Sequence, residues 1–215
     1  MSNGLFITFE GIDACGKSTQ IAKAAEYLRR KDISCVVTRE PGGTPIAEDI
    51  RTIILSPENS AMQDSCEVLL YLAARAQHVE EKIKPALEEG AIVLCDRFQE
   101  ATFAYQGFGR GFPLDVLNQL NNFATRGLEP TRTYVFDISV EMAFERLQTM
   151  GKKKDRLEKN SREFYQKIRE GYLALASART NRIKLLQGEK PVEELFDSIC
   201  KDIDSLIEVH LFDRK

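Results

Sequence analysis

The residues of this chain with the clearest chemical role form a glycine-rich loop near its start. Residues Gly11–Ser18 read GIDACGKS, which fits the pattern G-x-x-x-x-G-K-[S/T]. In such a loop the glycines let backbone N–H groups curl around phosphate oxygens. Lys17 can then reach the outer phosphates, and the hydroxyl of Ser18 can bind Mg²⁺. The loop therefore predicts a binding site for a nucleoside triphosphate.

The segments on either side of this loop support the same prediction. Leu5–Phe9 is an apolar segment typical of a strand, and apolar residues recur at helical spacing from Thr19 to Leu28. A strand, a glycine loop and a helix in that order are the context in which the motif binds phosphate. A chance glycine turn with an ordinary surface lysine would not require these flanks.

Two further segments place charged residues at the ends of predicted strands. Val93–Cys95 leads into Asp96 and Arg97, and another strand leads into Arg39 and Glu40. The carboxylate of Asp96 could hold Mg²⁺ directly or through water, and the planar fork of Arg97 suits a second phosphate group. Ligands in parallel α/β folds lie beyond the carboxyl ends of the strands. These residues and the glycine loop therefore predict a single site.

The fold that must position these residues alternates strands with helices. The predicted strands are Leu5–Phe9, Ser34–Thr38, Ala91–Cys95, Thr133–Phe136 and, more weakly, Arg182–Leu186. The predicted helices are Ser18–Lys31, Ile46–Leu55, Cys66–Glu89, Leu114–Arg126, Val140–Met150, Ser161–Ser177 and Val192–Val209. This alternation predicts an α/β fold with a parallel five-stranded sheet and helices on both faces. Because the 215 residues contain no repeat or linker, residues 1–215 should form one domain.

Composition narrows the classes of partner and the compartment. A net charge of −3 and a pI near 5.6 do not provide the basic surface that a nucleic acid polymer requires. The sequence shows neither a signal-peptide pattern nor an apolar run of membrane-spanning length. The five cysteines are scattered without CxxC spacing, and His78 and His210 lack metal-ligand spacing. We therefore expect a soluble cytoplasmic protein with free thiols, and histidines on the surface or on a helix face.

The order of several motifs resembles that of the thymidylate kinases. Besides the glycine loop, the resemblance rests on residues 38–45 (TREPGGTP), 67–75 (EVLLYLAAR), 96–98 (DRF), 104–107 (AYQG) and 151–156 (GKKKDR). It extends from about Leu5 to Tyr172. The resemblance implies a P-loop NTPase-type fold with a short basic lid at about residues 148–160. It also implies Mg²⁺-dependent transfer of the γ-phosphoryl group of ATP to dTMP, which gives dTDP and ADP for dTTP biosynthesis.

The resemblance also implies the residues of the site, from their positions in the matching motifs. ATP would be bound by Gly11, Ile12, Asp13, Ala14, Cys15, Gly16, Lys17, Ser18 and Thr19. The nucleotide dTMP would be bound by Asp13, Arg39, Arg51, Tyr71, Arg75, Arg97, Thr102, Tyr105 and Gln106. The catalytic residues would be Lys17, Arg97 and Arg156, and the ligands of Mg²⁺ would be Ser18 and Asp96.

Within this implied dTMP pocket, individual side chains would have separate tasks. Tyr71 would stack on thymine, and Arg75, one helical turn later on the same face, would address the edge of the base. Tyr105 would crowd C2′ of the sugar, which would disfavour ribonucleotides. Arg97 would hold the phosphate group, and Asp13 would lie near the 3′-hydroxyl.

Three positions depart from the usual family pattern. Tyr71 stands where phenylalanine is usual, and its hydroxyl needs a partner. Phe98 stands where another residue, often tyrosine, follows the Asp-Arg pair. Ala14 means that the glycine loop lacks the arginine that one branch of the family carries there. The chain is therefore similar to the bacterial-type branch, in which a basic lid, here with Arg156, supplies cations to the transition state.

The residues leave other functions open. The chain could be a P-loop kinase that phosphorylates another nucleoside or monophosphate, or a non-catalytic ATP-binding protein. A GTPase switch is disfavoured because the sequence lacks the guanine-reading motif Asn-Lys-x-Asp. The resemblance further implies a homodimer formed by helix packing, although the apolar residues of Cys66–His78 would fit either an interface or a core.

Overall fold

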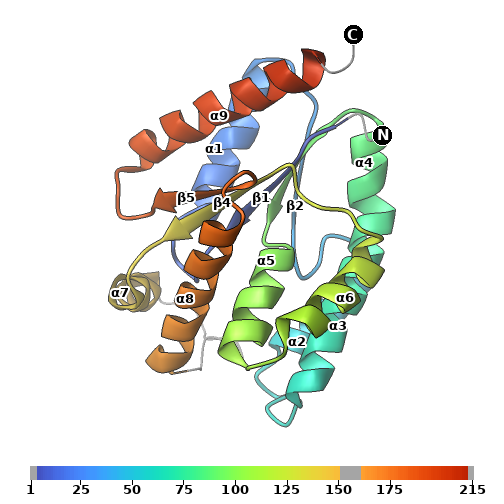
Figure 1. Ribbon diagram of the computed structural model, residues 1–215, viewed down its shortest axis with the longest axis vertical. Coiled ribbons are helices and arrows are strands. Elements are labelled where there is room, and N and C mark those ends of the chain that lie inside the picture. Colours follow the sequence, from blue (N-terminus) through green and yellow to red (C-terminus); the bar gives the residue numbers. More distant parts are fainter. Residues whose placement is uncertain (1–3, 151–160, 213–215) are drawn as a thin grey trace.

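A computed structural model of the chain describes residues 4–150 and 161–212, and these residues contain a five-stranded sheet (Figure 1). The strands are β1 (Phe6–Glu10), β2 (Cys35–Arg39), β3 (Ile92–Asp96), β4 (Arg132–Asp137) and β5 (Ile183–Gln187). Every pairing is parallel, in the order β2-β3-β1-β4-β5. The predicted five-stranded parallel sheet is confirmed. Each strand begins and ends within about one residue of its predicted bounds.

Helices cover both faces of the sheet, as predicted. On one face α1 (Lys17–Arg30) packs against α9 (Val192–Phe212), and on the other lie α3 (Asp64–His78), α5 (Gln99–Thr102) and α8 (Arg162–Ala178) (Figure 1). The remaining α-helices in the described residues are α2 (Pro45–Leu55), α4 (Lys84–Glu88), α6 (Leu114–Thr125) and α7 (Val140–Met150). None of the helices in this described part is long and apolar enough to cross a membrane.

The central strand β1 anchors the core and is buried along its whole length. Because successive side chains of a strand point to opposite faces, Phe6 and Phe9 join different hydrophobic clusters. The ring of Phe6 meets Phe98 edge-on at 4.9 Å between centroids, and the ring of Phe9 lies 5.4 Å from that of Tyr134. This packing gives the loops at the carboxyl ends of the strands a rigid base.

The long predicted helix Cys66–Glu89 is a continuous helical run of three parts. Helix α3 passes into a π-helical segment, η1 (Val79–Ile83), and then into α4. The sequence pattern predicted the extent of this run but not its wider π-helical turns, which are common near functional sites.

One helical segment was not predicted from the sequence. Helix α5 continues as a π-helical segment, η2 (Phe103–Gly109), which contains two glycines. Glycine destabilises helices by about 1 kcal/mol relative to alanine, so two glycines weaken the local signal for a helix. A Cβ on Gly107 would lie 2.5 Å from Leu114, and one on Gly109 would lie 2.8 Å from Phe164. The glycines therefore permit close packing against α6 and α8, and this packing outweighs their low helix propensity.

The predicted basic lid falls mostly beyond the residues that the structure describes. Gln148–Met150 form the end of α7. Residues 151–160, which include Arg156, lie outside the described residues.

Candidate active site

A pocket of about 390 Å³ lies where the carboxyl ends of β1, β2 and β3 meet α3 and the α5–η2 segment. It is lined by most of the predicted site residues: Asp13, Ala14, Cys15, Gly16, Lys17, Ser18, Thr19, Arg39, Arg51, Tyr71, Arg75, Asp96, Arg97, Thr102, Tyr105 and Gln106. Gly11 and Ile12 belong to the same loop but do not line the pocket. The fold thus brings segments that are up to about ninety residues apart in sequence to one place.

The glycine loop needs its glycines for both conformation and close approach. Gly11 and Gly16 have φ angles of 132° and 100°, which side chains rarely permit. A Cβ on Gly11 would also lie 2.6 Å from the carbonyl oxygen of Phe136 on β4. Helix α1 begins directly after Gly16, so its unpaired N–H groups and positive dipole end face the pocket.

The ammonium group of Lys17 folds back onto this loop. Its Nζ donates to the carbonyl oxygens of Gly11 and Ile12, both at 3.1 Å, and approaches the buried sulfur of Cys15 at 3.6 Å. The Lys17 side chain is nearly buried. The positive charge of the ammonium group therefore lies beside the N-terminus of α1, where both would stabilise anionic phosphates.

Ser18 and Asp96 form a pair suited to Mg²⁺. The hydroxyl of Ser18, in the first turn of α1, donates to Oδ2 of Asp96 at the end of β3, at 3.2 Å. A hydroxyl and a carboxylate are hard oxygen donors, and Mg²⁺ commonly uses one or two protein ligands together with phosphates and water. Among the described residues, no group of three or more His, Cys, Asp and Glu side chains could hold a metal ion by itself. The pair therefore fits Mg²⁺ that arrives with a nucleotide.

Arg97 is held in place by the glycine loop and by α8. Its guanidinium group donates to the Gly11 carbonyl at 3.0 Å, to the Tyr172 hydroxyl at 3.2 Å and to Oδ1 of Asp13 at 2.5 Å. The backbone of Arg97 has a φ of 70°, a conformation that costs a non-glycine residue about 1–3 kcal/mol and persists where the surroundings enforce it. This strained backbone turns the side chain into the pocket.

Asp13 is the centre of a polar cluster under the pocket. Its Oδ2 accepts hydrogen bonds from the hydroxyls of Tyr165 at 2.9 Å and Tyr105 at 3.2 Å. Burial alone would raise the pKa of the Asp13 carboxyl, but Arg97, Lys17 and the two hydroxyls lower it below its usual value. Asp13 is therefore ionised at neutral pH and can accept further hydrogen bonds.

The predicted base-recognition residues lie together, but Arg75 is more deeply engaged than expected. Arg75 is 1% exposed and donates to Glu40, Thr102, Asn121 and the Phe98 carbonyl. These four bonds use four of the five N–H groups of a guanidinium, which leaves one at Nη2. Arg75 can therefore offer a ligand in the pocket one N–H donor, and not the pair of parallel donors that an unoccupied guanidinium would provide.

The predicted phosphate-end arginines are also partly occupied. Arg39 places its Nη2 within 3.0 Å and 2.9 Å of the two carboxylate oxygens of Glu48, and Arg51 donates to the Pro41 carbonyl at 2.7 Å. Both side chains line the pocket.

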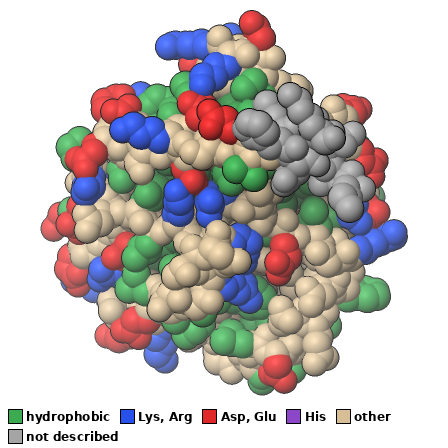
Figure 2. All heavy atoms as spheres, turned by 45° about the horizontal axis from the view of Figure 1, so that its top comes forward, with side chains coloured by type: hydrophobic (Ala, Val, Ile, Leu, Met, Phe, Trp, Pro, Cys, Tyr) green, Lys and Arg blue, Asp and Glu red, His purple; other side chains and the backbone are tan. Residues whose placement is uncertain are grey.

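On the face drawn in Figure 2, acidic and basic side chains are interspersed around a group of Lys and Arg residues. This is not the uniform basic surface that is typical of proteins that bind nucleic acids.

Three residues that contact the site could not be predicted from the sequence. Tyr165 of α8 donates to Asp13, Tyr172 of α8 donates to Glu10 and accepts from Arg97, and Arg146 of α7 donates to the Ala14 carbonyl at 3.1 Å. No local pattern marks these residues, because each lies on an ordinary amphipathic helix far from the glycine loop. Glu10, in contrast, is the last residue of β1, and Glu40 directly follows β2. Because both strands are predicted from the sequence, the position of these two residues at strand ends points to the site.

Glu10 makes a testable contribution to stability. It is fully buried at the end of β1, where its carboxyl accepts hydrogen bonds from Phe98 N at 2.7 Å and Tyr172 Oη at 2.9 Å. Burial, reinforced by the neighbouring Glu100 carboxylate, raises the pKa of Glu10 from 4.5 to about 8. Between these values the folded protein binds more protons than the unfolded chain, so its stability falls as the pH rises.

We expect Glu10→Gln to flatten this pH dependence. The slope contributed by one group is at most about 1.4 kcal/mol per pH unit, and glutamine cannot ionise. Its Oε1 can still accept from Phe98 N, and its Nε2 can donate to the Tyr172 hydroxyl. The free energy of unfolding should therefore decline less between about pH 5 and pH 8 in the variant than in the wild type. Urea unfolding of both proteins across this range measures it, and equal slopes would show that Glu10 does not titrate as described.

Comparison with known proteins agrees with the pocket geometry. The thymidylate kinase family model matches residues 9–199. The chain is 48% identical over 204 residues to a thymidylate kinase of Symbiobacterium thermophilum, covering 95% of this chain and 92% of that protein. It is 50% identical over 197 residues to a thymidylate kinase of Geotalea daltonii, covering 89% and 92%. A crystal structure of thymidylate kinase from Ehrlichia chaffeensis superimposes with a TM-score of 0.75 at 31% identity, covering 93% of this chain and 98% of that one. The chain therefore belongs to the thymidylate kinase family.

Proposed function

We propose that this protein transfers the γ-phosphoryl group of ATP to dTMP, giving dTDP and ADP. The observation that carries the proposal is that one pocket holds two sets of groups. The glycine loop, Lys17 and the Ser18–Asp96 pair suit a Mg²⁺-bound triphosphate, while Arg97 and Tyr71 line the adjoining part of the same pocket. Family membership supports this choice over a P-loop kinase with another acceptor and over a non-catalytic ATP-binding protein.

The ATP side of the site would bind phosphates through the backbone N–H groups of the loop and α1. Lys17 would stabilise the charge on the transferring group, and Ser18 with Asp96 would hold Mg²⁺. Bound Mg²⁺ would neutralise charge on the β- and γ-phosphates. Together these groups would align the γ-phosphorus with the acceptor, which is the main task of an enzyme that catalyses phosphoryl transfer.

The dTMP side of the site would bind the acceptor at both ends. Arg97, Arg39 and Arg51 would hold its phosphate group, and Asp13 would lie near its 3′-hydroxyl. Tyr71 would stack on thymine. The remaining Nη2 donor of Arg75, supported by the side chains of Thr102 and Gln106, would face the edge of the base.

The reaction needs no strong base. The dTMP phosphate is ionised at neutral pH, so one of its oxygens can attack the γ-phosphorus of ATP directly. The bond between the γ-phosphorus and the β–γ bridging oxygen breaks, and ADP leaves with the bonding electrons. Arg97 would position the attacking phosphate, and Arg156, outside the described residues, would supply a further cation to the transition state because Ala14 leaves the loop without one.

We also propose that the protein acts as a homodimer. Large apolar side chains are exposed on three helices that lie close together, namely Ile46 and Ile53 on α2, Leu69 on α3, and Leu114, Val116 and Phe123 on α6. Phe123 is 87% exposed, which is unusual for an aromatic residue that does not contact a partner. Helix packing across α2, α3 and α6 would bury these side chains.

A cytoplasmic location is supported by the chemistry of the cysteines. All five are free thiols. Burial raises the pKa of the half-buried Cys35 thiol to about 11, so this group is a poor thiolate nucleophile. Scattered free cysteines are typical of proteins that function in a reducing compartment.

A panel of acceptors tests the proposed function. ADP formation should depend on added acceptor, and kcat/KM should fall in the order dTMP, dUMP, then dCMP and UMP. Tyr105→Ala should improve UMP relative to dUMP because it removes the ring that crowds C2′. Tyr105→Phe is the matched control, since it keeps the ring and loses only the hydroxyl that contacts Asp13. A wild-type preference for a purine monophosphate would contradict the assignment of dTMP.

A further inference from the structure

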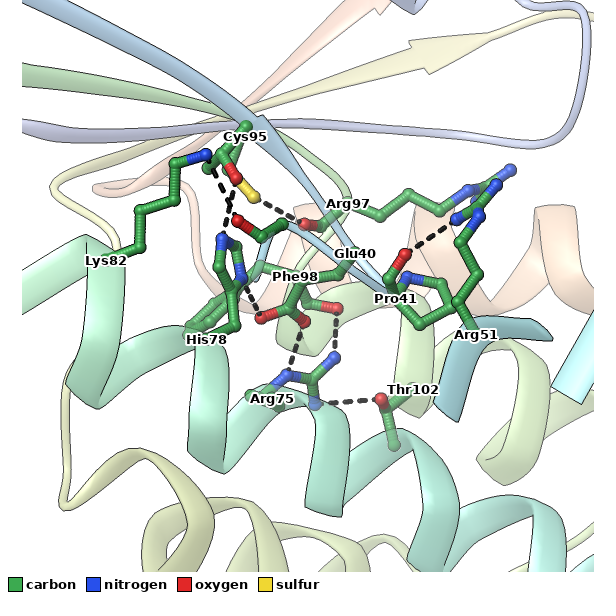
Figure 3. Close-up of polar contacts among 12 residues, drawn as sticks. Glu40, Pro41, Arg51, Arg75, His78, Lys82, Cys95, Arg97, Phe98 and Thr102 are labelled. Atoms are coloured by element: carbon green, nitrogen blue, oxygen red, sulfur yellow. Dashed lines mark hydrogen bonds and ion pairs between the residues drawn. The ribbon is translucent and has the colours of Figure 1, made fainter. Parts of the chain in front are cut away.

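The carboxylate of Glu40 is buried between two basic side chains of α3 (Figure 3). Its Oε2 accepts from Nε of Arg75 at 2.7 Å, and its Oε1 lies 3.1 Å from Nδ1 of His78. His78 is 0% exposed and lies on the inner face of α3, so of the two expected places, the surface or a helix face, it has the second. Its Nε2 lies 2.7 Å from the hydroxyl of Thr38. None of these contacts by itself binds a substrate.

One side of the α3–η1 run holds the loop that follows β2. Arg75, His78 and Lys82 are spaced by three and four residues, which places them on one helical face. Lys82 donates to the carbonyl oxygen of Gly43 at 3.1 Å. Gly43 has a φ of 94°, and a Cβ there would lie 2.5 Å from Nε2 of His78. The loop therefore lies directly on the imidazole ring.

The protonation states follow from these partners. Burial would raise the pKa of the Glu40 carboxyl, but Arg75 and His78 together lower it below its usual value. Because an ionised carboxylate has no proton to give, Nδ1 of His78 must donate to Glu40. In a neutral ring Nε2 then accepts from the Thr38 hydroxyl.

Glu40 is connected to both ends of the pocket. Through Arg75 it is joined to Thr102 and to the α5–η2 segment, where the base would lie. Through the backbone it is joined to Pro41, whose carbonyl accepts from Arg51, and its own N–H donates to the Asp96 carbonyl at 2.9 Å. In Figure 3 the side chains of Arg51 and Arg97 extend away from Glu40 to the same side.

We propose that Thr38, Glu40 and His78 form a buried clamp that positions the acceptor pocket. Glu40 and His78 are positioning residues: His78 fixes the Glu40 carboxylate, and Glu40 fixes Arg75 and the Pro41 loop relative to each other. The clamp couples the phosphate end of the pocket to the base end, and so it controls binding of the acceptor nucleotide rather than of ATP. This inference rests on the proposed function for the identity of that acceptor.

Variants of His78 and Thr38 test the clamp without touching the pocket. His78→Leu removes both ring nitrogens, whereas His78→Asn keeps an amide donor near the place of Nδ1. Thr38→Val removes only the hydroxyl that orients the ring. Thr8→Val is the matched control. The hydroxyl of Thr8 on β1 makes a buried 2.8 Å contact with the hydroxyl of Thr133 on the neighbouring strand β4, and Thr8 does not line the pocket.

The clamp predicts that variants of His78 and Thr38 change KM for dTMP much more than KM for ATP. His78→Leu should raise KM for dTMP about tenfold, as expected for loss of a charge-assisted hydrogen bond, with KM for ATP changed less than about twofold. His78→Asn should recover part of the loss, and Thr38→Val should show a smaller increase. Thr8→Val should lower the melting temperature but leave both constants unchanged. If His78→Leu raises both constants and lowers kcat in parallel with its loss of stability, the role of His78 is only structural.

Amide hydrogen exchange provides a readout that does not depend on activity. In His78→Leu, exchange at the amides of Glu40 and residues 42–44 should accelerate by more than about tenfold, whereas in Thr8→Val it should stay at the wild-type rate. Unchanged exchange at these amides overturns the clamp whatever the enzyme does. A wild-type protein that fails to phosphorylate dTMP, with accelerated exchange in His78→Leu, overturns the proposed acceptor and leaves the clamp standing.

Discussion

Replacing Lys17 by alanine is expected to lower kcat by about 10²- to 10³-fold while the protein remains folded. The ammonium group lies over the glycine loop, where it would meet charge on the transferring phosphoryl group. Loss of one such preorganised electrostatic contact in an active site typically has an effect of about this size. Steady-state kinetics at saturating ATP and dTMP measure the loss, and circular dichroism checks the fold.

Lys23→Ala is the matched control for this experiment. Lys23 lies on the same helix but pairs with Glu193 outside the pocket, so its removal should leave kcat nearly unchanged. A folded Lys17→Ala variant with wild-type turnover would contradict the assignment of the phosphate site. A loss of equal size in Lys23→Ala would instead indicate a general effect on α1.

The second large effect is expected at Arg97. Arg97→Ala should lower kcat/KM for dTMP by about two to three orders of magnitude, because it removes the proposed phosphate contact and leaves Asp13 without its close cation. Arg97→Lys should restore only part of the loss, since an ammonium carries its donors on one nitrogen and lacks the planar fork with which Arg97 contacts Asp13, Gly11 and Tyr172. KM for ATP should change much less in both variants.

The same kinetics separate Arg97 from a structural role. If Arg97→Ala weakened ATP and dTMP equally, the side chain would serve mainly to hold the glycine loop through the Gly11 carbonyl. A variant with unchanged kcat/KM for dTMP would remove Arg97 from the acceptor site altogether.

The sheet was predictable from sequence because its signals are local. Buried parallel strands such as Ala91–Cys95 are short apolar runs, and the glycine loop has a fixed spacing that places a strand before it and a helix after it. Asp96 and Arg97 could be placed in the site for the same reason, because strand ends at one edge of a parallel sheet converge.

The parts that could not be predicted depend on tertiary packing. The α5–η2 segment is helical despite Gly107 and Gly109, because close contact with neighbouring helices outweighs propensity. Likewise, the sequence places Arg75 one turn after Tyr71 but cannot show that Glu40, Thr102 and Asn121 occupy most of its donors. The contacts of His78 were missed for the same reason, since Thr38 and Glu40 are about forty residues away.

Transfer of a labelled phosphoryl group tests the central claim most directly. The wild-type protein would be incubated with Mg²⁺, dTMP and ATP labelled at the γ-phosphorus, and the label would be followed into products. The pocket geometry predicts that the label appears in dTDP in step with ADP formation and that little of it becomes inorganic phosphate. Label that accumulates as inorganic phosphate, or ADP formation at the same rate without dTMP, would contradict the account.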